Sequence, residues 1–225
     1  MRTTISNLLC FLLFIITCST ASAQKKTIHV VPEEAKIFVD GNEVGNGSYT
    51  VKFKSSIDFF MLRFECPGYI TRHVKLLRTN PQKTVSYTMD EDEAMLNSVG
   101  GEGTDIANRW FDVTCRKGLT EDVVWKRLMN VAVNNFEEVE VRDKAAGWIK
   151  TRWRTTVFKN QVVRTRMEVR MSFLEENELS YRARIVSEIK DRDCLGNQCF
   201  MKYNRVLKQY ESVIQDLQTT VGSNL

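Results

Sequence analysis

The feature that most constrains the fold is a stretch of alternating residues at positions 148–190. It predicts three long antiparallel strands over residues 147–158, 162–173 and 179–190, separated by short polar turns. Successive side chains of a strand point to opposite faces of a sheet. We therefore predict a sheet with one apolar face that must be covered and one basic face that can stay in water.

The two predicted faces differ in chemistry. Apolar residues and threonines occupy one set of alternate positions: Ile149, Thr151, Trp153, Thr155, Val157, Val163, Thr165, Met167, Val169, Met171, Tyr181, Ala183 and Ile185. Cations occupy the other set: Lys150, Arg152, Arg154, Arg164, Arg166, Arg170, Arg182 and Arg184. Trp148 shares the basic face, and the acids on it are Glu168 and Glu188.

The first 23 residues predict a cleaved signal peptide. Arg2 gives a positive start, residues 8–16 form an apolar core, and residues 21–23 (Ala-Ser-Ala) form a small-residue cleavage signature. The apolar run is shorter than the about 20 residues that a membrane-spanning helix needs, and no later stretch approaches that length. We expect export to the periplasm or cell envelope, and a lipoprotein anchored at Cys18 is the alternative.

Four cysteines follow the predicted cleavage point: Cys66, Cys115, Cys194 and Cys199. Exported proteins meet an oxidising compartment, so we predict a Cys194–Cys199 disulfide that closes a short loop. Closing so small a loop should stabilise the fold by no more than the low end of about 2–4 kcal/mol. No histidine accompanies these cysteines, so we predict no metal site. The state of Cys66 and Cys115 is left open.

Residues 24–90 predict a small all-β unit with frequent turn signals. Its motifs occur in an order that resembles the PEGA family: an alanine-led strand, a DG turn, a short VG segment and a GY corner. Here these are Ala35 to Val39, Asp40-Gly41, Val44-Gly45 and Gly68-Tyr69. The resemblance covers residues 26–90 and implies a β-sandwich module of bacterial envelope proteins without catalytic residues. The apolar run at 57–62 departs from the pattern, and we expect it to be core rather than an exposed contact patch.

Residues 91–104 are acidic and then glycine-rich, which predicts an exposed linker. Beyond it, Thr120 is a predicted helix N-cap, and the apolar residues that follow it to Phe136 recur at helical spacing. The same spacing over residues 203–217 predicts a long final helix across the sheet. The element order is then β-α-β-β-β-β-α.

That order resembles the helix-grip fold, in which an antiparallel sheet grips a C-terminal helix. The shared pattern within residues 105–221 also resembles BamC-type domains: Trp125, Phe136, Asp143 to Gly147 and Trp148. Such domains are protein-interaction modules without catalysis. The predicted fold class is therefore α+β, with a PEGA-like sandwich over 24–90, a linker over 91–104 and a two-helix helix-grip domain over 105–225.

The sequence predicts no enzyme and no cofactor. Nucleophilic catalysis needs a serine or cysteine beside a base, and both histidines, His29 and His73, belong to the predicted sandwich. The candidate site is instead the basic face with Trp148, because closely spaced cations attract anionic partners. An ordinary solvated face, whose cations pair with nearby acids, is the other interpretation. Nucleic acid is not an expected partner of an exported chain.

Two functions remain. The first is a non-catalytic envelope protein that acts as an adaptor for another envelope protein. The second is a binding protein for a small anionic or glycan ligand, held on the basic face or in a groove between helix and sheet. An exposed apolar patch on the sandwich and a filled core would favour the first function, and a roomy cavity beneath the final helix would favour the second.

Overall fold

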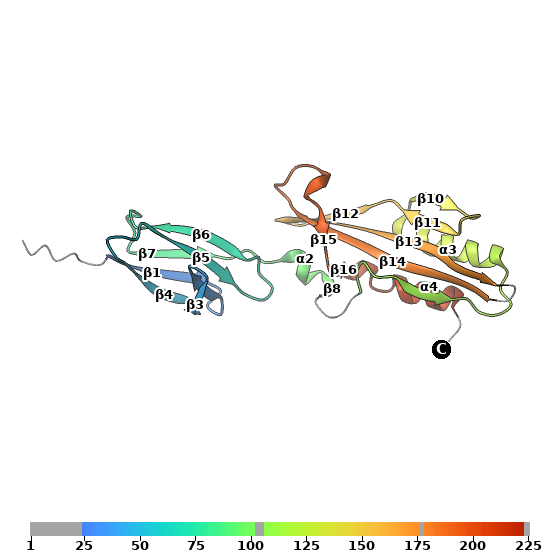
Figure 1. The fold of residues 1–225 in the computed structure, drawn as a ribbon, viewed down its shortest axis with the longest axis horizontal. Helices are drawn as coiled ribbons and strands as arrows, with labels where there is room; N and C mark the ends of the chain where they lie inside the picture. Colours follow the sequence, from blue (N-terminus) through green and yellow to red (C-terminus); the bar gives the residue numbers. More distant parts are fainter. Residues whose placement is uncertain (1–23, 102–105, 176–177, 223–225) are drawn as a thin grey trace, which may run out of the picture. The chain divides into compact units, whose positions relative to one another are not determined.

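The computed structural model describes residues 24–101, 106–175 and 178–222 (Figure 1). The predicted signal peptide, with Cys18, lies outside these residues. The chain divides into two compact units, Met1–Glu91 and Asp92–Leu225. Within the described ranges, no helix combines the length and the apolar composition that a membrane crossing requires.

The α+β fold class predicted from the sequence is wrong, because the protein is mainly β. Strands hold 50% of the residues and helices 19%. The described α-helices are α2 (Glu93–Leu96), α3 (Glu121–Phe136) and α4 (Val213–Val221). The expected long final helix is replaced over most of its length by a strand, β16 (Arg205–Leu207), and a single 3-10 turn. Pairing of β16 with another strand outweighs the helical spacing of its apolar residues.

The first unit has two sheets that share one core. Their strand orders are β4-β1-β7 and β3-β2-β5-β6. The strands are β1 (Gln24–Val31), β2 (Lys36–Val39), β3 (Asn42–Asn46), β4 (Ser48–Phe53), β5 (Phe59–Glu65), β6 (Arg72–Leu77) and β7 (Thr84–Thr88). Ile28 and Val51 of one sheet and Ile37 and Leu62 of the other are buried in that core.

The apolar run at 57–62 is divided between the two faces of β5. Leu62 is fully buried, whereas Phe59 and Met61 are 42% and 45% exposed. Phe59 lies opposite Leu77 on β6, which is 45% exposed. The expectation that this run is core therefore holds for one side of the strand, and the other side leaves apolar surface in water.

The second unit is built on a seven-stranded sheet. Its main order is β10-β11-β13-β14-β15, with β12 paired to β13 and β9 paired to β14. The strands are β9 (Phe111–Thr114), β10 (Val139–Asp143), β11 (Trp148–Thr151), β12 (Arg154–Val157), β13 (Gln161–Glu175), β14 (Glu178–Asp191) and β15 (Met201–Lys202). The long hairpin of β13 and β14 forms the centre of this sheet.

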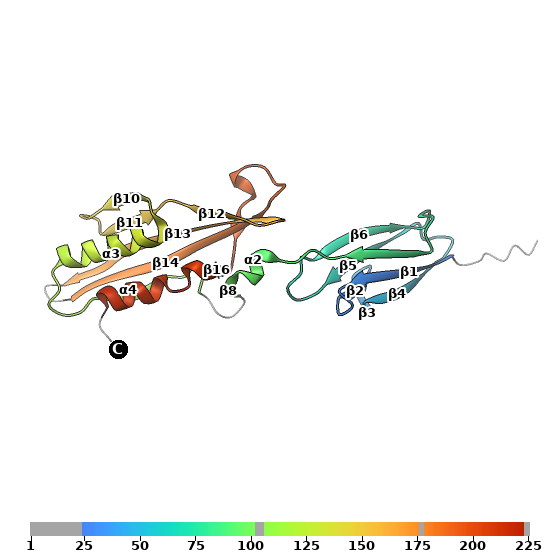
Figure 2. The same ribbon diagram turned by 180° about the vertical axis from the view of Figure 1, so that it is seen from behind.

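Two helices cover one face of that sheet, which we call the inner face. Figure 2 shows α3 and α4 lying across it, and Figure 1 shows the opposite, outer face. Leu128 of α3 and Leu217 of α4 are fully buried in the same core as Val169 of β13. The ring of Phe136 stacks on that of Tyr210 with 4.8 Å between centroids. The inner face is therefore covered by closely packed apolar side chains.

Helix α3 begins where the sequence predicts. The Thr120 side chain accepts a hydrogen bond from the Val123 amide, and Glu121 and Asp122 occupy the first turn. The helix ends after Phe136, where Glu137 adopts a positive φ of 62°.

The end of α4 meets the chain just after β9. The Arg116 amide donates to the Val221 carbonyl at 2.9 Å, and Cys115 forms an isolated bridge with Gly222. Strand β9 is thus held between β14 on one side and the end of α4 on the other.

The expected linker at 91–104 contains regular structure in its described part. Helix α2 and strand β8 (Ser98–Gly100) both lie there, and β8 pairs with β16. Ala94 is fully buried in the core of the second unit. The acidic and glycine-rich residues of this segment form a helix cap and a turn. The Asp92 side chain accepts a hydrogen bond from the Met95 amide, and Gly100 has a positive φ of 92°.

Candidate interaction surface

The predicted alternation holds along β13 as far as the register shift after Met171, and along β14 from Ser180 onward. Val163, Met167 and Val169 are fully buried on the inner face, as are Tyr181 and Ile185. The arginines between them lie on the outer face, opposite the side that α3 and α4 cover (Figures 1 and 2). The hydrophobic effect fixes this register, because a slip by one residue would expose every one of these apolar side chains.

The alternation fails between β11 and β12, where one residue is inserted. Lys150 pairs with Glu168, whereas Arg154 pairs with Thr165. Four steps along one strand therefore face three along β13, which is the pattern of a β-bulge. Directly opposite residues share a face. Arg154 is thus moved to the inner side, and the face assignments of residues 153–157 are reversed from the prediction.

The reversal corrects five predicted positions. Trp153, Thr155 and Val157 belong to the outer face instead of the apolar one, and Val157 is 58% exposed. Arg154 leaves the basic face and forms two hydrogen bonds with Glu137 at the end of α3, at 2.7 and 2.8 Å. Arg152, in the break itself, pairs with Glu138 at 3.2 Å. Arg152 and Arg154 are therefore occupied at the helix end and do not join the other cations.

The remaining cations interleave with aromatic rings along the outer face. Trp153 has the guanidinium carbons of Arg164 and Arg166 at 4.4 and 4.3 Å from its ring centroid. Arg184 lies 4.4 Å from the ring centroid of Trp110. We call this arrangement the ring–cation ladder; its members are Trp110, Trp148, Trp153, Phe200, Arg164, Arg166, Arg170, Arg184 and Lys190.

Trp148, the predicted aromatic member of the site, stacks against a cation of its own sheet. Arg170 lies 5.2 Å from its ring centroid and 5.6 Å from that of Trp110. The attraction between a cation and a ring quadrupole acts at the ring face. These ring faces are thus engaged by a guanidinium group, and the exposed Arg170 side chain is what this part of the surface offers to a partner.

Carboxylates neutralise most of the ladder from within. Glu168 is 2% exposed. It accepts two hydrogen bonds from Arg184, at 2.7 and 2.9 Å, and forms an ion pair with Arg166 at 2.8 Å. Glu188 pairs with Arg164, whose Nε lies 2.6 Å from the carboxylate. Buried charges are tolerated in proteins when they are paired in this way.

Lys150 and Arg182 complete the predicted basic face. Lys150 lies 3.1 Å from Glu140 and has a mostly buried side chain. Arg182 is 51% exposed and its partner Asp112 is 77% exposed, with 3.2 Å between them. The exposed pair is screened by water, so its contribution is small.

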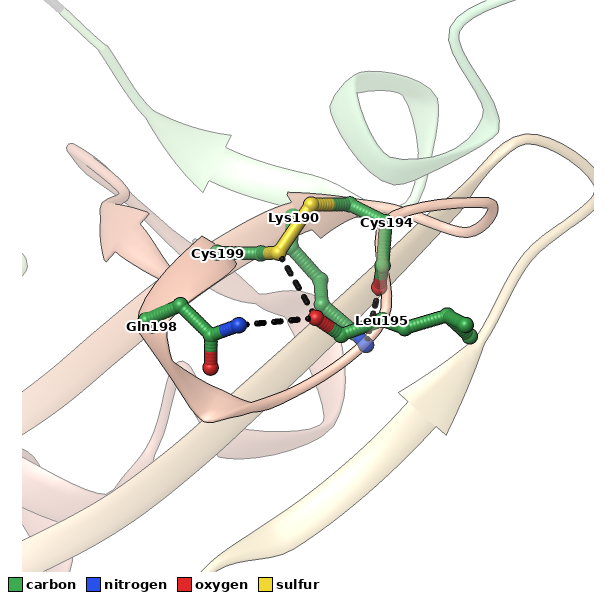
Figure 3. The surroundings of a disulfide bond; sticks show 5 residues. All are labelled: Lys190, Cys194, Leu195, Gln198 and Cys199. Carbon is green, nitrogen blue, oxygen red and sulfur yellow. Dashed lines mark hydrogen bonds between the residues drawn. A yellow bond between two sulfur atoms is a disulfide. The ribbon is translucent and has the colours of Figure 1, made fainter.

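The Cys194–Cys199 disulfide is present, as predicted, and its loop lies at one end of the outer face (Figure 3). Lys190 donates to the Cys194 carbonyl at 2.7 Å, and Arg164 donates to Asn197 Oδ1 at 3.2 Å. The loop therefore caps two cations of the ladder. Leu195 at its tip is 84% exposed.

The two other cysteines are free thiols. Cys66 is partly exposed in the first unit, and Cys115 is buried in the second. Burial raises the pKa of the Cys115 thiol to about 11. Within the described residues, no cluster of three or more His, Cys, Asp or Glu side chains is placed to hold a metal ion.

Sequence reasoning missed four members of the ladder. Lys190 was omitted although it lies on the predicted strand 179–190 at the same alternate positions as Arg182 and Arg184. Trp110 and Phe200 precede short strands whose pairing partners cannot be read from local pattern, and Trp153 was placed on the wrong face. The available signal was the alternation for Lys190 and the aromatic content of segments 110–115 and 199–203 for the two rings.

No protein-family model and no curated protein matches the chain. The resemblances of residues 26–90 to PEGA domains and of residues 105–221 to BamC-type domains therefore stay predictions.

Proposed function

We propose that this protein is a non-catalytic adaptor of the bacterial cell envelope that binds another envelope protein through the outer face of its larger sheet. The observation that carries the proposal is the ring–cation ladder on the face opposite α3 and α4. Rings and arginines are the side chains most enriched where proteins bind one another.

The shape of the surface favours a macromolecular partner over a small ligand. Small-molecule sites are usually concave and enclose most of the ligand, whereas this face is one side of an open sheet. The inner face is filled by α3 and α4, whose buried residues contact the sheet directly. These features support the adaptor over a ligand held between helix and sheet.

The chemistry of the ladder favours an acidic protein over a neutral glycan. A sugar ring binds proteins by stacking on a free aromatic face, and here cations engage the faces of Trp153 and Trp148. Exposed guanidinium edges suit carboxylates, which they contact through paired hydrogen bonds. A binding protein for an anionic glycan is the second candidate, supported by the same cations.

The first unit supplies a second contact area of a different kind. Phe59, Met61 and Leu77 are all more than 40% exposed on adjacent strands, and Lys75 lies 4.0 Å from the Phe59 ring centroid. Exposed apolar groups of this sort favour association with proteins. Two dissimilar contact areas on separate units are what an adaptor requires.

Site-specific photocrosslinking in the native envelope tests this function. A photoreactive residue at Ser172 or Lys202 samples the outer face, and one at Lys126 on the exposed side of α3 is the matched control. We expect the same protein species to be captured from both outer-face positions and not from Lys126. Equal capture from all three positions, or none from the outer face, would contradict the proposal.

A further inference from the structure

We infer that Arg170 and Arg182 form the carboxylate-binding pair of the outer face, and that an aspartate or glutamate side chain of a partner protein docks between them. This inference rests on the proposed function, and it assigns the contact to two of the predicted cations. It also gives the partner a defined chemistry at that point.

The two arginines are placed as a pair by the register of the central hairpin. Arg170 of β13 lies directly opposite Arg182 of β14, and both side chains are exposed. Directly opposite residues have Cβ atoms about 5 Å apart, and like charges in that position destabilise a sheet. An anion bound between the two guanidinium groups removes this repulsion.

The pair is also the least neutralised part of the outer face. Arg164, Arg166 and Arg184 are paired with Glu188 or Glu168, whose side chains are 27% and 3% exposed. Among the described side chains, Arg182 forms an ion pair only with the exposed Asp112, and no acid forms one with Arg170. Binding capacity for an external anion therefore concentrates at Arg170 and Arg182.

Neighbouring side chains hold Arg170 in place for binding. Its guanidinium lies between the rings of Trp148 and Trp110, which limits its rotamers before any partner arrives. A donor that is already ordered loses less entropy on binding.

Two hydroxyl groups extend the same patch along the strands. Ser172 follows Arg170 by two residues, Ser180 precedes Arg182 by two, and their Oγ atoms are 2.7 Å apart. Only one proton is used between the two oxygens, so the other hydroxyl can donate to an anion. The patch thus combines two guanidinium groups with neutral donors, which is the donor set that a carboxylate accepts from.

Titration of the full chain with a hexaglutamate peptide tests the inference. We expect the peptide to bind at low ionic strength, where exposed charges are least screened. The fluorescence anisotropy of a labelled peptide measures this binding. The NMR signals of the Nε–Hε groups of Arg170 and Arg182 should shift, and so should the indole N–H signal of Trp148. A hexaglutamine peptide should not bind.

Single substitutions give the decisive comparison. Arg170→Gln and Arg182→Gln should each weaken hexaglutamate binding about five- to tenfold, because each removes a charge-assisted contact. Arg152→Gln is the matched control, since Arg152 is also exposed (67%, against 51% for Arg182) but pairs with Glu138 at the end of α3; it should change affinity less than about twofold.

Equal effects of all three substitutions would overturn the pair, because they would mean diffuse charge attraction. Binding of polygalacturonate but not of hexaglutamate, with the same dependence on Arg170, would overturn the protein carboxylate in favour of an acidic glycan. If the inference about Arg170 and Arg182 is wrong but the proposed function is right, crosslinking from Ser172 and Lys202 still captures the same protein. If the proposed function is wrong, that capture is absent. The two results are therefore distinguishable.

Discussion

The guanidinium carbon of Arg166 lies 4.3 Å from the ring centroid of Trp153, and both side chains belong to the outer face of the sheet. Strict alternation from Ile149 would have put this tryptophan on the opposite face, under α3. Because of the bulge between β11 and β12, Trp153 lies among the cations of the outer face. The same bulge places Arg154 near the end of α3, where it donates a hydrogen bond to Glu137.

Replacing Trp153 by alanine should destabilise the second unit by about 1–3 kcal/mol. The ring is partly buried between Arg164 and Arg166, so the variant loses both apolar burial and two cation–ring contacts. Urea unfolding followed by circular dichroism measures the change. Val157→Ala, at an exposed position of the same face, should stay within about 0.5 kcal/mol; an equal loss in both variants would refute a specific role of the ring.

Glu168→Gln should cost about 2–3 kcal/mol of stability. The substitution keeps the shape but removes the charge that holds Arg166 and Arg184, and it leaves both guanidinium groups without their carboxylate. Their 19% and 30% exposure lets water offset part of the loss. Glu140→Gln is the control, because Glu140 is 44% exposed and its pair with Lys150 should be worth at most about 1 kcal/mol. Indistinguishable denaturation midpoints would show that the Glu168 network adds nothing.

Removing the disulfide should have a small effect on folding. Cys194→Ser with Cys199→Ser opens a loop of only six residues, for which chain entropy predicts a loss of about 2 kcal/mol or less. The contacts of Lys190 and Arg164 to the loop can still form in the variant. Thermal unfolding and the tryptophan fluorescence spectrum provide the measurement. Loss of the folded state would mean that the loop is far more important than its size indicates.

Stability should fall at alkaline pH because of Tyr181. Its hydroxyl is buried without a hydrogen-bond partner in the described structure, and burial raises its pKa to about 12 from an ordinary value of 10.0. Between these values the unfolded chain releases a proton that the folded chain retains, so stability present below pH 10 is lost as the pH rises toward 12.

Tyr181→Phe tests this point. The variant should be more stable than the parent by about 1 kcal/mol at neutral pH, because an unsatisfied buried hydroxyl is removed. It should also lose less stability between pH 10 and 12, as measured by urea unfolding at each pH. Some alkaline loss will remain from Cys115, whose pKa is also raised. An unchanged pH dependence would exclude Tyr181 as the source.

The free thiols should differ strongly in reactivity. Thiolate is the nucleophilic form, and burial raises the pKa of Cys115 to about 11 while also blocking access. Iodoacetamide at pH 8 should therefore modify the partly exposed Cys66 first, and Cys115 only after unfolding. Peptide mass spectrometry of folded and urea-unfolded protein reports both rates, and early labelling of Cys115 would argue against the packing of β9.

Local pattern predicted the parts of the fold that local chemistry determines. The alternation persists from Val163 to Val169 and from Tyr181 to Ile185 because the same face is buried in both stretches, and α3 begins after Thr120 because its hydroxyl satisfies a free backbone amide. The Cys194–Cys199 bond follows from short spacing in the chain. Each of these signals lies within a few residues of the structure it predicts.

Long-range pairing determined the parts that the sequence did not reveal. Val206 and Leu207 have helical spacing with Tyr210, yet they pair with β8, more than a hundred residues earlier. No residue type near Arg152 marks the β-bulge in the sequence. The face on which Trp153 lies therefore depends on how β12 pairs with β13. The sequence therefore predicted the sheet face, most of its cations and Trp148, whereas Trp110, Trp153 and Phe200 joined the site through tertiary contacts.

The backbone hydrogen bond from Arg116 to Val221 has a consequence for the order of folding. During synthesis β9 is made long before α4, and until the last helix is present Val113 and Tyr181 lack part of their apolar cover. The second unit can therefore complete its core only after residues 213–222 have been synthesised.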